Sequence, residues 1–176
     1  ELRSLEYLAL GLWFLYDQVQ KIEAEIANRV GRNKPVFYFG NHPDLEGIPQ
    51  GLVACAFHWY AVSACNYVKM VGWLTDGGDR TKAREYMESV LPKVYLWRHK
   101  VAAHFAIIDP RKEDNAADLA KSVMFPISFD NDAFYADSLK LAISSGDKKS
   151  ISGDMRWSLT HTHRDLIPRY WPSKSA

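Results

Sequence analysis

The stretch MESVLPKVYLWRHKVAAHFAII (residues 87–108) places apolar side chains at alternating steps of four and three residues. This spacing keeps one face of a helix against a neighbour, so the stretch predicts a helix with a continuous core-facing seam. The seam positions are Met87, Leu91, Val94, Arg98, Val101, Phe105 and Ile108. Arg98 is the exception among them, because arginine is rarely buried without a partner or a function.

The helix that carries this seam is expected to begin at Arg80, after an N-cap at Asp79, and to kink or break at Pro92. Two further long helices precede it. Residues 2–30 step by three and four without a miss, and Gly31 is a natural stop.

The second helix is expected over the apolar run at 52–74. A run of this length must be weighed as a membrane span. Asn66 and Lys69 lie well inside it, so we favour a central helix covered by its neighbours and expect no membrane partner.

The character of the chain changes after a short helix expected at 115–123. Residues 123–129 and 134–144 alternate in the manner of strands, and residues 155–170 can form a last helix. The sequence therefore predicts a mainly α fold: an antiparallel bundle of three long helices plus a short one (1–122), with a small β element and a C-terminal helix packed on it (123–176). We expect a single domain overall.

Composition limits the classes of function. The 22 basic and 21 acidic residues nearly cancel, so binding to nucleic acid would need a local basic patch. Cys55 and Cys65 are interpreted as reduced core thiols, and the first residues lack the features of a signal peptide. Both observations favour the cytoplasm.

Arg98 and His104 are the strongest candidates for chemistry. On a helix they lie about 60° to either side of Val101 and roughly 9 Å apart along the axis. Two copies of the helix crossing antiparallel at Val101 would therefore place Arg98 of one beside His104 of the other, twice over. Arginine can hold a phosphate and histidine can transfer protons near neutral pH, which suffices for attack of an RNA 2′-hydroxyl on its own phosphodiester without a metal.

The alternatives to catalysis stay open. Arg98 can reach from the edge of the seam to a carboxylate while His104 makes one hydrogen bond in the core, or the pair can hold an anion without chemistry. Basic side chains are concentrated in this region of an otherwise neutral chain, where they could receive an RNA backbone. They are Lys82, Arg84, Lys93, Arg98, His99 and Lys100.

The segment Arg98-His99-Lys100-Val101-Ala102-Ala103-His104 resembles the motif of HEPN domains, and the resemblance extends to the helical layout of residues 2–108. It implies a homodimer whose motif lines a cleft, and a metal-independent endoribonuclease of toxin–antitoxin or abortive-infection systems. Arg98 and His104 would form the catalytic pair, with His99 as the polar neighbour. The implied partners are RNA and an antitoxin or other protein, with no cofactor. The alternative is a non-catalytic helical module that binds a partner, an anion or RNA.

His161 and His163 form a second, weaker candidate. In a strand the two rings would share a face and could ligate a metal, whereas on a helix His161 shares its face with Asp165 and His163 points nearly opposite. No third ligand is evident nearby, so we expect no metal site.

Overall fold

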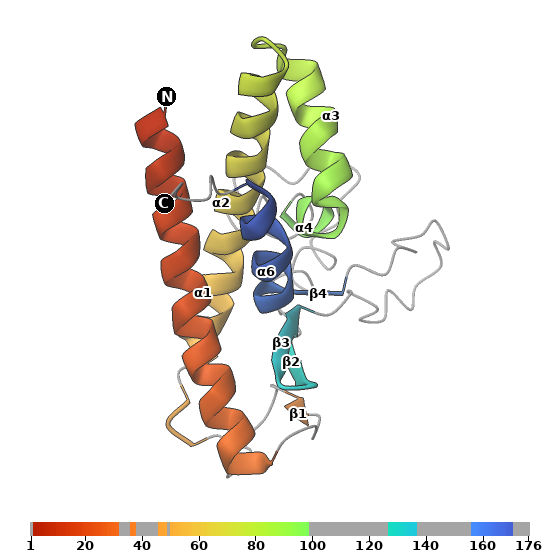
Figure 1. Ribbon diagram of the computed structural model, residues 1–176. Helices are drawn as coiled ribbons and strands as arrows, with labels where there is room; N and C mark the ends of the chain where they lie inside the picture. The colour runs from red at the N-terminus through yellow and green to blue at the C-terminus, as the bar shows by residue number, and fades with distance from the viewer. Residues whose placement is uncertain are drawn as a thin grey trace, which may run out of the picture.

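The computed structural model describes residues 2–31, 36–37, 46–48, 50–98, 127–136 and 156–170. Within these ranges the protein is mainly helical, with a small antiparallel sheet beside the helices (Figure 1). The helices are α1 (Leu2–Val30), α2 (Gln50–Thr75), α3 (Arg80–Val90), α4 (Pro92–Trp97) and α6 (Leu159–Tyr170).

Helix α1 confirms the prediction for residues 2–30. It ends at Gly31, whose φ of 89° lies in the left-handed region and whose N–H donates to the Ala27 carbonyl at 3.1 Å. Glycine adopts this conformation without steric cost, which explains why the helix stops there. The face of α1 that carries Leu12, Val19 and Ile26 is fully buried.

Helix α2 confirms the expected central helix and packs between α1 on one side and α3 and α4 on the other (Figure 1). None of the helices, as far as the structure describes them, is long and apolar enough to cross a membrane. The prediction of two core thiols is half wrong, because Cys65 is buried whereas Cys55 is exposed. An all-apolar helix gives no periodicity from which its outward positions could be read.

The predicted break at Pro92 is confirmed, and it divides the expected third helix in two. Asp79 caps α3 by accepting hydrogen bonds from the N–H groups of Thr81 (2.9 Å) and Lys82 (3.1 Å). Leu91 leaves the helical region (φ −125°, ψ 51°), because the residue before a proline is disfavoured there. Pro92 then opens α4, where its missing N–H costs nothing.

The first half of the predicted seam faces the core. Met87, Leu91 and Val94 are all less than a tenth exposed. The second half, with the predicted continuation of the helix to residue 108 and the short helix at 115–123, lies outside the described residues.

Four short strands pair antiparallel in the order β1 (Val36–Phe37), β2 (Ile127–Asp130), β3 (Ala133–Ala136) and β4 (Trp157–Ser158) in the described part of the chain. The turn between β2 and β3 is formed by Asn131 (φ 49°) and Asp132 (φ 59°). Two successive left-handed residues make a type I′ turn, whose twist suits a hairpin. The predicted strand 134–144 is described only as far as Ala136.

The last helix begins later than predicted. Trp157 and Ser158 belong to strand β4, where they pair with Ala136 and Tyr135 of β3, and α6 starts at Leu159. The expectation of a helix from residue 155 is therefore wrong at its start. The Trp157 ring lies against Phe57 at a centroid distance of 4.9 Å, so pairing and burial together hold this segment extended.

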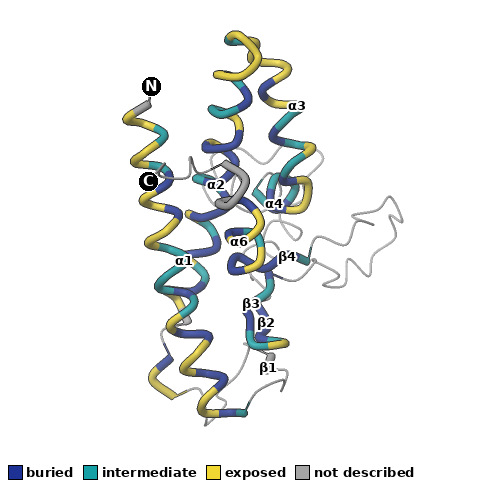
Figure 2. Tube along the Cα trace, in the orientation of Figure 1, coloured by how far each residue is buried: buried dark blue, intermediate teal, exposed yellow. Residues whose placement is uncertain are grey.

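Buried residues of helices α1, α2, α3, α4 and α6 and of strands β2, β3 and β4 join one core. Strand β1 comes from the loop between α1 and α2 yet pairs with β2, and α6 packs on α1. In Figure 2 the buried positions gather where α1, α2, α6 and the sheet face one another, and the outer faces of the long helices are exposed. Both segments on either side of residue 122 contribute to this core.

Candidate functional site

Arg98, the anomalous position of the seam, is half-buried directly after α4. Its guanidinium hydrogen-bonds the thiol of Cys65 on α2. Burial raises the pKa of the Cys65 thiol to about 11, although the charge and hydrogen bond of Arg98 act in the opposite direction. Arg98 therefore joins the end of α4 to the central helix through a neutral thiol.

The other members of the predicted site lie outside the described residues. These are His99, Lys100 and His104. The proposed pairing of Arg98 with His104 across two copies consequently stays a prediction.

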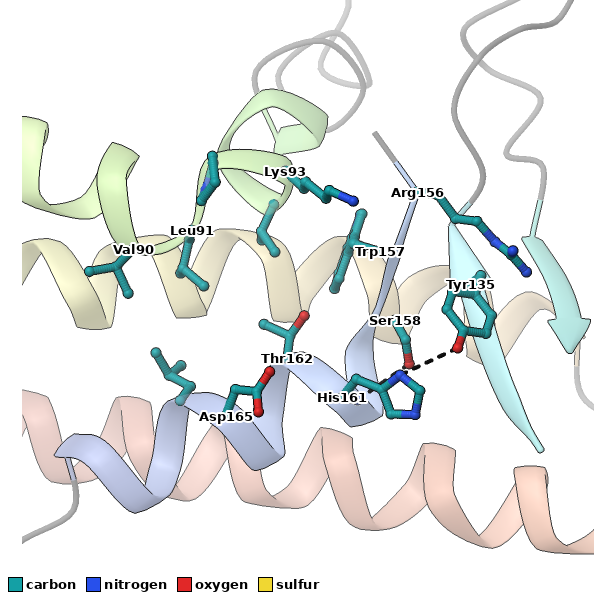
Figure 3. Close-up of a pocket in the computed structure, with 13 residues that line it drawn as sticks. Val90, Leu91, Lys93, Tyr135, Arg156, Trp157, Ser158, His161, Thr162 and Asp165 are labelled. Atoms are coloured by element: carbon teal, nitrogen blue, oxygen red, sulfur yellow. Dashed lines mark hydrogen bonds between the residues drawn. The ribbon is translucent and has the colours of Figure 1, made fainter. Parts of the chain in front are cut away.

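A different group of polar side chains surrounds a cleft of about 390 Å³ between the α3–α4 junction, strands β3 and β4, and α6 (Figure 3). The side chains of Val90 and Leu91 lie at one end of this cleft, and Lys93, Arg156, Tyr135 and His161 lie toward the other. Ser158, Thr162 and Asp165 line the side formed by β4 and α6. The cleft thus joins an apolar end to a polar, partly basic end.

Strand pairing and the start of α6 position the polar end. Tyr135 is directly opposite Ser158 in the β3–β4 ladder. The Ser158 hydroxyl accepts a hydrogen bond from the backbone N–H of His161 at 3.3 Å, which caps the first turn of α6. The Tyr135 hydroxyl and His161 Nδ1 are 3.3 Å apart, so the imidazole is held beside the phenol.

Arg156 fixes the other side of the Tyr135 ring. Its guanidinium carbon lies 4.1 Å from the ring centroid, and its Nη2 is 2.9 Å from the Asp130 carboxylate. Asp130 balances Arg156, and the ammonium of Lys93 and the carboxylate of Asp165 also line the cleft. The site can therefore hold a molecule with both an anionic and a neutral, hydrogen-bonding part.

His163, two residues from His161, lies on the buried face of α6. It is 1% exposed, stacks on Tyr16 with 4.3 Å between ring centroids, and meets the edge of Trp13 at 4.7 Å. Burial lowers the pKa of His163 to about 4, so the ring is neutral at physiological pH.

Tyr60 is the hydrogen-bond partner of the His163 ring. The Tyr60 hydroxyl is 3.1 Å from His163 Nδ1, and burial raises the pKa of Tyr60 well above its ordinary value. The phenol therefore stays protonated and shares one hydrogen bond with Nδ1, which leaves Nε2 as the other polar atom of the ring. That nitrogen is buried and has no hydrogen-bond partner among the described residues.

His161 and His163 both lie on helix α6, one exposed and the other buried, so the two rings do not share a face. Within the described ranges no three side chains of His, Cys, Asp or Glu are grouped to hold a metal ion.

Glu23 of α1 connects the two elements that carry Tyr135 and His161. Its carboxyl is 3% exposed and accepts hydrogen bonds from the Phe134 N–H (2.8 Å) and the Thr160 hydroxyl (2.7 Å). Burial raises the pKa of Glu23 to about 7, against the smaller opposing effects of these bonds and of Arg164. Glu23 thus anchors the polar wall of the cleft from behind without lining it.

Sequence reasoning found part of this site. The four-residue spacing of His161 and Asp165 and the basic character around Lys93 were both visible in the sequence. The roles of Tyr135 and Arg156 depend on the pairing of β3 with β4, which no local pattern announces.

Comparison of the chain with models of protein families, with curated proteins and with solved structures gave no match. A function for this chain is therefore inferred from the geometry of the cleft.

Proposed function

We propose that this chain is a helical RNA-binding protein that holds one nucleotide of a single-stranded RNA in the cleft between α4, α6 and strands β3–β4. The observation that carries the proposal is the division of the cleft into an apolar end, a carboxylate and a basic end. A nucleotide has the matching order of a flat base, a ribose and a phosphate. A volume of about 390 Å³ lies within the range of small-molecule sites.

Each part of the cleft suits one part of the nucleotide. The base would lie against Val90 and Leu91, which removes its faces from water. The ribose 2′-hydroxyl would donate to Asp165, as ribose hydroxyls do to acidic side chains in dinucleotide sites. The phosphate would accept hydrogen bonds from Lys93 and from His161 at the positive first turn of α6.

A binding experiment tests this proposal directly. Fluorescence anisotropy of a labelled, short single-stranded RNA should show binding that weakens with added salt, because phosphate contacts release counterions. Lys93→Glu should raise Kd by about tenfold or more. Lys69→Glu is the matched control, because Lys69 is exposed on α2 away from the cleft and the variant has the same net charge.

The ribose contact gives a second readout. A DNA strand of the same sequence should bind more weakly than RNA, and Asp165→Asn should narrow that difference, since the 2′-hydroxyl distinguishes the two. The proposal fails if wild type binds no RNA, or if Lys93→Glu and Lys69→Glu bind alike.

A second candidate function is cleavage of RNA by a HEPN-type, metal-independent endoribonuclease acting in the cytoplasm in defence or toxin systems, with an antitoxin as protein partner. It is favoured by the half-buried place of Arg98 directly after α4. In a homodimer His104 would take the proton of a ribose 2′-hydroxyl, and that oxygen would attack the adjacent phosphorus. Arg98 would neutralise the charge that develops on the phosphoryl oxygens, and a protonated His104 would return a proton to the departing 5′-oxygen.

Cleavage assays in the presence of a chelator separate this candidate from simple binding. Wild type should yield fragments with 2′,3′-cyclic phosphate ends, while Arg98→Ala and His104→Ala should not, and Lys69→Glu should cut as wild type does. Circular dichroism of Arg98→Lys and Arg98→Ala shows whether these variants stay folded without the native hydrogen bond to Cys65. A loss of cleavage can then be separated from a loss of structure. If wild type cuts nothing, or if both alanine variants cut as well, the ribonuclease is excluded and the binding proposal still stands.

A further inference from the structure

Helix α1 exposes large apolar side chains on the face that points away from the core. Tyr7 is 74% exposed, Leu10 60% and Phe14 62%. Single exposed apolar residues are ordinary, but a continuous apolar patch on a helix is typical of a contact surface.

The exposed residues form a regular seam. They are spaced alternately by four and three residues, the pattern by which one helix packs along another. The positions of this outer seam are Arg3, Tyr7, Leu10, Phe14, Asp17 and Lys21. The inner seam of the same helix, which includes Leu12, Val19 and Ile26, is already occupied by the core.

We propose that a second copy of this chain binds the outer seam, with the two α1 helices antiparallel and a two-fold axis at Leu10. A symmetric contact of this kind meets its own residues in reverse order. Arg3 and Asp17 are each seven positions from Leu10, so Arg3 of one copy lies opposite Asp17 of the other. The contact is made twice.

Charge complementarity selects this arrangement. In a parallel pair Arg3 would face Arg3 and Asp17 would face Asp17, which is repulsive at both ends of the apolar patch. In the antiparallel pair both ends are attractive. Asp17 already accepts hydrogen bonds from Lys21 (2.6 Å) and Gln18 (3.1 Å) of its own helix, but it is half exposed, and a carboxylate has room for a third donor.

The residues near the axis permit a close approach. A side chain added at Gly11 would meet no atom within 4 Å, so this position leaves the surface beside Leu10 flat. Trp13 packs its ring on His163 and Tyr16 yet stays 42% exposed. Like Tyr7 it is three positions from Leu10, so its exposed part would lie across the axis from Tyr7 of the second copy. The contact would cover the apolar patch that is open in a single chain.

The oligomeric state in solution tests the proposal. Analytical ultracentrifugation at micromolar concentrations should give a dimer for wild type and a monomer for Leu10→Arg, which places two like charges together on the axis. Asn28→Arg is the matched control, because Asn28 is exposed on the same helix beyond the antiparallel overlap, and it should remain a dimer.

A charge exchange tests the orientation. Arg3→Asp alone should raise the dimer Kd by about tenfold, and Arg3→Asp combined with Asp17→Arg should restore it. Neither change would lower the dimer Kd of a parallel pair.

Other occupants of the seam give different results. A monomeric wild type, or a dimer that Leu10→Arg leaves intact, overturns the proposal. If wild type is monomeric and binds phosphatidylcholine vesicles in a way that Leu10→Arg abolishes, the seam binds a lipid surface instead. None of these outcomes tests the RNA cleft, because the variants at Leu10, Arg3 and Asp17 leave the cleft residues unaltered.

Discussion

The two faces of α6 put the same residue type to opposite uses. His161 is exposed, lies beside the hydroxyl of Tyr135 in the sheet and borders the cleft. His163 is enclosed by Trp13, Tyr16 and Tyr60 and is held neutral by burial. The difference teaches that position on the helix, and not the imidazole itself, decides which histidine is available for chemistry and which one supports the fold.

The largest expected effect is on the buried side. His163→Ala should lower the free energy of unfolding by about 3 kcal/mol, because it opens a cavity among three aromatic rings and leaves the Tyr60 hydroxyl without its hydrogen-bond partner. His161→Ala is the matched control and should change it by less than about 0.5 kcal/mol. Urea unfolding of both variants measures the contrast, which would disappear if the two losses were equal.

The pH dependence of stability sharpens the same contrast, because Glu23 and His163 act with opposite signs. Glu23 has a raised pKa in the fold, so its contribution is complete below its ordinary value of 4.5 and is lost as the pH rises through about 7. The loss amounts to roughly 3 kcal/mol. His163 has a lowered pKa, so its contribution is present above 6.5 and is lost as the pH falls toward 4.

Glu23→Gln removes the pH-dependent contribution of Glu23 to stability and leaves that of His163. Urea unfolding from pH 4 to pH 8 should then show a stability that rises to about pH 6.5 and stays level above it. In wild type the two effects offset each other between about pH 4.5 and 6.5, and the stability falls slightly up to about pH 7. Gln can still accept from the Phe134 N–H and donate to the Thr160 hydroxyl. Glu6→Gln, at an exposed position of the same helix, should follow wild type. Parallel curves for wild type and Glu23→Gln would contradict the burial argument.

A smaller effect is expected when each histidine loses its phenol. Tyr60→Phe should lower the free energy of unfolding by about 1–2 kcal/mol, since the buried Nδ1 of His163 loses its hydrogen-bond partner. Tyr135→Phe removes the corresponding partner of the exposed His161 and should cost less than about 0.5 kcal/mol. Equal losses in chemical denaturation would mean that burial does not separate the two pairs.

The smallest expected effect belongs to the exposed side and concerns binding. His161→Ala should raise the Kd for single-stranded RNA by about threefold, because one phosphate contact is lost while Lys93 remains. Anisotropy measures the change, and Asn28→Ala supplies a surface control. An RNA affinity that is indifferent to His161 would remove this residue from the site.

Local patterns predicted the elements whose boundaries are local. The α1 helix, its stop at Gly31, the cap at Asp79 and the break at Pro92 each follow from residues within a few positions of one another. The start of α6 was misplaced because Trp157 and Ser158 owe their extended form to pairing with Ala136 and Tyr135, about twenty residues earlier.

The cleft was only partly predictable for the same physical reason. Its walls come from segments around residues 90–94, 135 and 156–166, which only the tertiary fold brings together. The sequence pointed to Lys93, His161 and Asp165 separately but contained nothing to show that they share one space. The outward position of Cys55 was hidden because α2 is apolar on every side.

The hydrogen bond between Glu23 and Thr160 constrains the order in which the protein folds during synthesis. The two residues are 137 positions apart, so a nascent chain completes α1 and α2 long before Thr160 leaves the ribosome. Until then the carboxylate of Glu23 remains hydrated, and the surface that α6 will cover stays open. The docking of α6 on α1 is therefore a late event that waits until α6 has been synthesised.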